Sequence, residues 1–126
     1  ARYAVLLCYL GEPEKAMEQI KRAMRIDPFC SDLVLETEGL CHFVSCDFES
    51  AIASFKKMQI ETRTSLFYTA ASLRKIGKSE DAKKVLKVAQ TESGMENEKF
   101  VSSQLFQRES DKSSLSGALE EIQASL

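Results

Sequence analysis

The chain has 126 residues, of which 44% are hydrophobic and 29% charged, with a formal net charge of −2. This composition is ordinary for a folded domain. The small net charge gives no reason to expect polyanion binding, and no apolar run approaches the roughly 20 residues needed to cross a bilayer. We therefore expect neither nucleic acid nor a membrane as the partner.

The first residues and the cysteines indicate a compartment. No apolar signal segment opens the chain, no glycosylation sequon is present, and there are four cysteines, which we expect to be reduced thiols. The sequence therefore predicts a cytoplasmic protein. The chain opens at Ala1 inside an apolar-periodic pattern, so we also expect a fragment of a longer protein.

Eight segments with helical periodicity follow one another along the chain. Glycine and proline mark their ends: Pro13 suits a first helical turn, and Pro28 opposes helix in the residue before it. Ser31 or Asp32, then Asp47 and Ser79, are the expected N-caps. The expected helices span residues 1–10, 13–26, 32–45, 48–60, 63–76, 80–93, 96–108 and 112–125.

A turn residue followed five residues later by an alanine occurs three times. The pairs are Gly11 with Ala16, Cys46 with Ala51, and Gly77 with Ala82. The alanines are 35 and 31 residues apart, a period typical of helical repeat arrays. Small residues at these positions, and at Gly39 and Ala70, would let two helices of a pair approach closely.

These residues resemble the tetratricopeptide repeat (TPR), matched by the strings 11–16, 47–52 and 77–82. Cys46 departs from the family by replacing the usual glycine. The resemblance implies an all-α fold of about three antiparallel helix pairs in a right-handed superhelix. Its expected units are residues 1–30, 31–62 and 63–94, which together form the array 1–94. Residues 95–126 lack the motif and are expected to form a C-terminal capping helix pair.

A second resemblance concerns residues 11–29 and the C-terminal tail. They are similar to the C-terminal repeat region of bacterial, rhizobial-type class III adenylate/guanylate cyclases. The tail residues that carry this similarity are Phe100, Phe106, Asp111, Leu115 and Leu119. This likeness implies the regulatory region of a larger signalling protein. A repeat domain behind a winged-helix transcriptional regulator and a stand-alone TPR scaffold remain open alternatives.

Residues suited to catalysis or metal binding are few. Cys41, His42 and Cys46 place three soft ligands within six residues. A structural metal site needs four ligands, and His42 projects about 100° away from Cys41 on a helix. The chain also lacks a phosphate-binding glycine loop, a nucleophile elbow and any cyclase catalytic motif. We expect no enzyme activity of this chain alone, no cofactor and no metal.

Charge alternates along the chain, at +1 for residues 1–31, −4 for 32–62, +4 for 63–93 and −3 for 94–126. We interpret this as solvated faces of mixed sign, although it would also suit docking of repeats or protomers. The same interpretation applies to the basic cluster, which has no interleaved aromatic residues. It comprises Arg74, Lys75, Lys78, Lys83, Lys84 and Lys87.

The TPR resemblance places a concave binding groove along the first helix of each pair. Its expected lining is Tyr9, Glu36, Leu40, Phe43, Val44, Phe67, Arg74 and Lys75. The apolar members would be unusually exposed if nothing covered them. A peptide or helix of a partner would cover them, and so would the C-terminal helices of the chain itself. We therefore expect a non-catalytic module for protein–protein interaction or self-association. Its partner would be a protein, a peptide, its own upstream domain or a further copy in a homo-oligomer.

Overall fold

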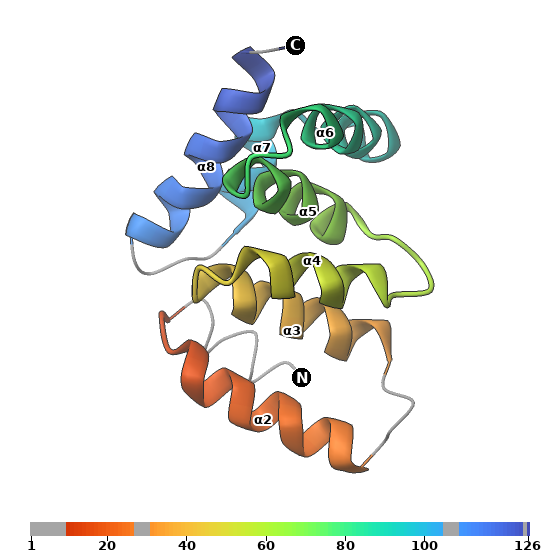
Figure 1. Cartoon of the computed structure of the whole chain (residues 1–126), viewed down its shortest axis with the longest axis vertical. Coiled ribbons are helices and arrows are strands. Elements are labelled where there is room, and N and C mark those ends of the chain that lie inside the picture. The colour runs from red at the N-terminus through yellow and green to blue at the C-terminus, as the bar shows by residue number, and fades with distance from the viewer. Residues whose placement is uncertain (1–9, 27–30, 105–108, 125) are drawn as a thin grey trace.

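The computed structural model describes residues 10–26, 31–104, 109–124 and 126, and it contains helices and no strand within these ranges (Figure 1). Its helices are α2 (Pro13–Ile26), α3 (Asp32–Val44), α4 (Phe48–Lys56), α5 (Arg63–Lys75), α6 (Ser79–Ser93), α7 (Asn97–Ser103) and α8 (Glu109–Ala124). The expected all-α class is confirmed for these residues. The expected first helix lies outside the described residues except for Leu10, which is in a turn.

Successive helices pack on one another from α2 to α6, each contacting the next (Figure 1). The last helix departs from this order, because α8 lies against α5, α6 and α7 together. An aromatic cluster joins the layers at their centre. Tyr68 of α5 makes edge-to-face contacts with Phe43 of α3 and Phe100 of α7, at centroid distances of 5.0 and 5.7 Å. Three helices far apart in the sequence therefore share one core.

The small residues of the repeated motif lie where helices meet. Ala16, Ala51, Ala70 and Ala82 each have an exposed fraction of 0%. The ring of Phe55 fills the space beside Gly39, where a Cβ would lie 2.6 Å from the ring's Cζ atom. Close approach of α3 and α4 therefore depends on the absence of a side chain at residue 39.

The turns that precede the motif alanines have left-handed backbone. The φ angles are 78° at Gly11, 63° at Cys46 and 85° at Gly77. Gly94, at the C-cap of α6, also has a positive φ, of 66°. Cys46 is the one residue other than glycine with positive φ in the described part of the chain. It adopts the left-handed conformation that Gly11 and Gly77 adopt in the corresponding turns, at a strain of about 1–2 kcal/mol.

Most helix bounds lie within one residue of expectation, but the end of α4 differs. This helix ends at Lys56 rather than at residue 60. The carboxylate of Asp32 accepts hydrogen bonds from the backbone N–H groups of Gln59 and Ile60, both at 2.9 Å. These bonds hold the two amides in a loop, so the helix cannot continue through them. Asp32 thus fastens this loop to the start of α3.

Other helix ends also differ from expectation. The N-cap of α6 is Lys78, without a side-chain cap bond, and Ser79 is the first helical residue. At the other end of the chain, α7 ends at Ser103 and α8 begins at Glu109, whereas the expected helices ended at 108 and began at 112. Asp47 caps α4 as expected, accepting a hydrogen bond from the Ser50 N–H at 3.4 Å. The sequence patterns therefore identified the helices better than their ends.

The start of α5 is linked to α3. The Thr62 side chain caps α5 by accepting from the Ser65 N–H at 3.1 Å, while the Thr62 N–H donates to the Ser65 hydroxyl at 2.9 Å. The same Thr62 hydroxyl donates to the carboxylate of Glu36 in α3 at 2.6 Å. The N-cap residue of α5 is thus held by a side chain of α3.

Candidate functional site

The apolar residues of the expected groove are buried by the chain itself. Leu40, Phe43, Val44 and Phe67 have exposed fractions of 3, 2, 6 and 0%. Phe67 stacks on the ring of Phe100 in α7, with centroids 4.2 Å apart. Of the two occupants considered for this surface, the C-terminal helices of the chain therefore cover Phe67. Tyr9 lies outside the described residues.

The polar groove residues are engaged differently. Glu36 is half-buried and accepts the Thr62 hydroxyl, which makes it part of the loop attachment. The guanidinium of Arg74 pairs with Glu121 of α8 at 3.0 Å, whereas Lys75 is exposed. Phe67 and Arg74 both belong to α5, and both contact the C-terminal helices, Phe67 through α7 and Arg74 through α8.

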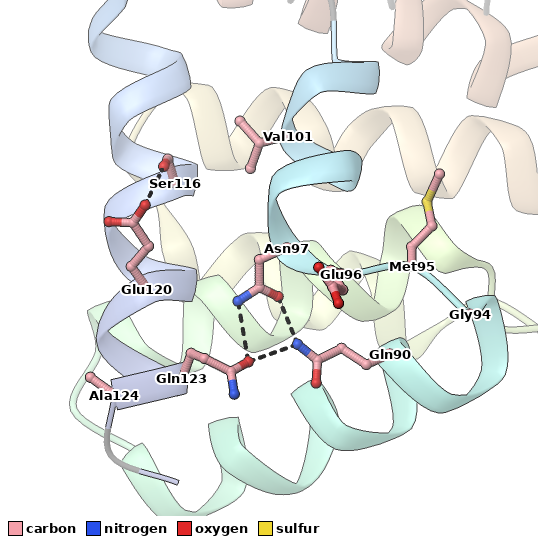
Figure 2. A pocket seen from close by; sticks show the side chains of 10 residues that line it. All are labelled: Gln90, Gly94, Met95, Glu96, Asn97, Val101, Ser116, Glu120, Gln123 and Ala124. Carbon is pink, nitrogen blue, oxygen red and sulfur yellow. Dashed lines mark hydrogen bonds between the residues drawn. The ribbon is translucent and has the colours of Figure 1, made fainter.

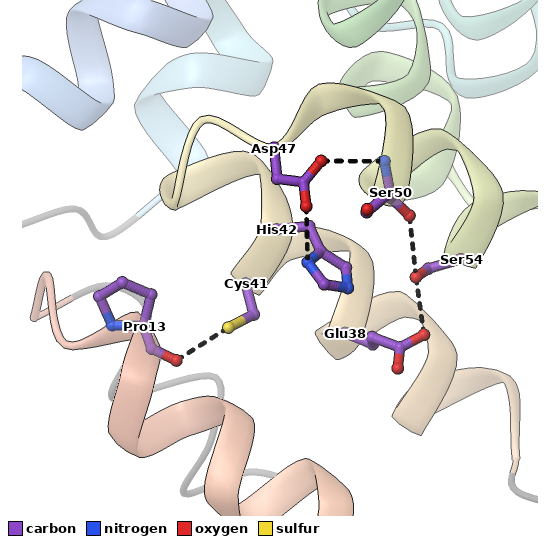
Figure 3. Close-up of polar contacts among 7 residues, drawn as sticks. All are labelled: Pro13, Glu38, Cys41, His42, Asp47, Ser50 and Ser54. Carbon is purple, nitrogen blue, oxygen red and sulfur yellow. Dashed lines mark hydrogen bonds and ion pairs between the residues drawn. The ribbon is translucent and has the colours of Figure 1, made fainter.

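Of the three candidate metal ligands, Cys41 and His42 point toward different neighbours (Figure 3). The buried Cys41 thiol donates to the Pro13 carbonyl oxygen at 2.9 Å. His42 Nδ1 lies 4.0 Å from a carboxylate oxygen of Asp47, and Cys46 is exposed. No cluster of three histidine, cysteine or acidic side chains suited to a metal ion occurs in the described residues. Cys41 and His42 instead connect α3 to its neighbours.

A cleft of about 700 Å³ opens at the other end of the chain, between the end of α6, the start of α7 and the end of α8 (Figure 2). Its lining comprises Gln90, Gly94, Met95, Glu96, Asn97, Val101, Ser116, Glu120, Gln123 and Ala124. Half of these residues are exposed and Val101 is buried beneath them. The cleft is therefore open to solvent above a small apolar floor.

Three carboxamides, one from each helix, meet in this cleft. Gln90 Nε2 donates to Asn97 Oδ1 at 3.0 Å and to Gln123 Oε1 at 2.8 Å. The remaining amide groups of Gln90 and Gln123, an oxygen and a nitrogen, point away from this triad (Figure 2). Each carboxamide has two donors and two acceptor lone pairs, so the triad leaves hydrogen-bonding capacity for a ligand.

Sequence reasoning did not find this cleft. Gln90, Asn97 and Gln123 belong to no motif, and they lie on three different helices, so no helical periodicity relates them. Only the packing of α8 across α6 and α7 unites them. The one available signal was the loss of the repeated motif after residue 94, which marked this end of the chain as different.

Comparison of the chain with protein-family models, with curated proteins and with solved structures found no match. None of the helices in the described ranges has both the length and the apolar character required of a membrane span. The function of the chain is therefore inferred from the geometry of its own residues.

Proposed function

We propose that the chain is a non-catalytic protein-interaction module, a TPR-like array of antiparallel helix pairs with α7 and α8 as its C-terminal cap. The burial of the recurring alanines carries this proposal. Ala16, Ala51 and Ala82 occupy the same place relative to a left-handed turn, and each is fully buried. Three helices that repeat one contact in this way are typical of a solenoid, whose usual role is binding.

The binding site in this proposal is the cleft between α6, α7 and α8. The apolar side chains of the expected groove are already covered, so a partner would have to displace the chain's own residues to reach them. The cleft needs no such displacement, because its rim is exposed. Its volume of about 700 Å³ is in the range of known ligand sites.

The chemistry of the cleft favours binding over catalysis. Its central groups are the carboxamides of Gln90, Asn97 and Gln123. Carboxamides donate and accept hydrogen bonds but do not ionise near neutral pH, so they cannot act as general acids or bases. Peptide main chain offers the matching donors and acceptors at regular spacing. An extended segment of a partner protein is therefore the proposed occupant.

Selection of peptides from a displayed random library on the purified chain tests this function. We expect enriched peptides to bind the chain and to lose about tenfold or more in affinity on Ser116→Trp, because the indole would fill the cleft. Ser113→Trp is the matched control, since Ser113 is exposed on the same helix but does not line the cleft. Failure to enrich any peptide, or equal binding to both variants, would overturn the proposed site.

A further inference from the structure

The residues that line the cleft include carboxylates but no basic side chain; a cation outside the lining, the Arg63 guanidinium, contacts the Met95 sulfur at 3.6 Å. The carboxylates are those of Glu96 and Glu120, which are both exposed. Neither carboxylate pairs with a basic side chain of the described ranges. Glu120 accepts one long hydrogen bond, at 3.4 Å, from the Ser116 hydroxyl. Both carboxylates therefore retain lone pairs for a charged donor.

Two helix ends add to this charge. Residues at the C-terminal ends of α6 and α8 line the cleft, and neither helix has a basic residue in its last turn. A helix C-terminus carries a partial negative charge, which a lysine or arginine usually offsets. The start of α7 opposes this field, but α7 has only seven residues and Glu96 occupies its N-cap position. The cleft as a whole thus favours a cation.

The floor of the cleft suits a long cationic side chain. The buried Val101 is part of the lining, so the cleft offers apolar surface beside the carboxylates. Arginine and lysine place their methylene stems on apolar surface while the charged head stays at the rim. A guanidinium also donates to carboxylate and amide oxygens in one plane.

We propose that the cleft binds an extended basic peptide segment of a partner protein, an inference that rests on the proposed function. Glu96 and Glu120 pair with arginine or lysine side chains of this segment. The carboxamides of Gln90, Asn97 and Gln123 bond to its main chain. The charge of the ligand is thereby specified by the rim and its extended form by the triad.

Fluorescence anisotropy with three labelled octapeptides tests the charge. One peptide alternates glycine with arginine, the second alternates glycine with serine, and the third alternates glycine with glutamate. We expect the arginine peptide alone to bind, with an affinity that falls as salt rises. The double variant Glu96→Gln/Glu120→Gln should weaken its binding about tenfold, because charge-assisted hydrogen bonds become neutral ones. Glu14→Gln/Glu18→Gln is the control, since it makes the same change of charge at exposed positions of α2.

Equal weakening by the two double variants, or equal binding of the three peptides, would overturn the charge inference. So would binding of the arginine peptide that survives Ser116→Trp, since it would then bind elsewhere. Selected peptides that need an open cleft but contain no arginine or lysine would leave the proposed function standing and overturn this inference alone. If the double variant loses helicity by circular dichroism, each single variant is measured instead, with a loss of about threefold expected from each.

Sedimentation of the chain without peptide distinguishes one further occupant. A salt-sensitive dimer that disappears in the Glu96→Gln/Glu120→Gln variant would identify the basic segment as that of a second copy, and would overturn the proposal of a separate partner. A monomer at all salt concentrations, together with binding of the arginine peptide, supports it.

Discussion

Helices α3 to α6 and the C-terminal pair α7–α8 are held in place by different means. In the first region, small residues remove side-chain volume between helices, and rings such as Phe55 fill the space beside them. In the second, Phe100 of α7 and Leu119 of α8 are buried in the core, while the contacts at the start of α7 are made by carboxamides. The cleft of about 700 Å³ thus opens where carboxamides, rather than close-packed small and aromatic side chains, join α6, α7 and α8.

The largest effect is expected where the second region depends on the first. Phe100→Ala removes the stack on Phe67 and the contact with Tyr68, and should lower the free energy of unfolding by about 3–5 kcal/mol. Thermal denaturation followed by circular dichroism measures this. Phe48→Ala, at a half-buried ring that contacts only Phe43 among the described rings, is the control and should cost less. Equal losses of stability in the two variants would contradict a larger contribution of Phe100 to the core.

A matched glycine pair compares the two regions directly. Gly39→Ala should destabilise the chain by about 1–3 kcal/mol, because its Cβ would overlap the ring of Phe55. Gly117→Ala in α8 meets no atom within 4 Å and should stabilise the chain by up to about 1 kcal/mol through helix propensity. Urea denaturation of both variants measures the two changes. Effects of the same sign would contradict the contrast in packing.

The smallest effect is expected at the ion pair between the regions. Arg74 and Glu121 are 3.0 Å apart, but their side chains remain 36% and 60% exposed. A double-mutant cycle of Arg74→Ala and Glu121→Ala should therefore give a coupling energy of about 0.2–1 kcal/mol, reduced by added salt. A larger, salt-insensitive coupling would mean that this pair contributes to holding α8 on α5 to an extent that an exposed ion pair does not.

Much of the fold could be predicted from the sequence, because its signals are local. Apolar periodicity and the glycines at 11, 77 and 94 located the helices, and the spacing to Ala51 identified Cys46 as a turn residue, although its left-handed backbone was not predicted. The end of α4 could not be predicted, because it depends on Asp32, 27 residues before the first amide that it binds. Periodicity contains no information about a contact at that separation.

The candidate site was less accessible to prediction. The TPR resemblance selected apolar residues such as Phe43 and Phe67, and all the apolar residues it selected within the described ranges are buried. A pattern shows that a side chain is apolar but does not show which part of the chain covers it. The cleft depends instead on the angle at which α8 crosses α6 and α7. No local signal in the last 30 residues predicts that angle. Residues such as Gln123 therefore looked like ordinary helix surface.

The Thr62 hydroxyl has a consequence for how the molecule opens. It caps α5 and at the same time donates to Glu36, while Asp32 holds the two amides just before it. Detachment of α3 would release this loop and free the cap of the next helix in a single event. Local unfolding is therefore coupled across residue 62, where the repeat units 31–62 and 63–94 were expected to divide. We therefore expect the amides around residue 62 and those at the start of α5 to open together in hydrogen exchange.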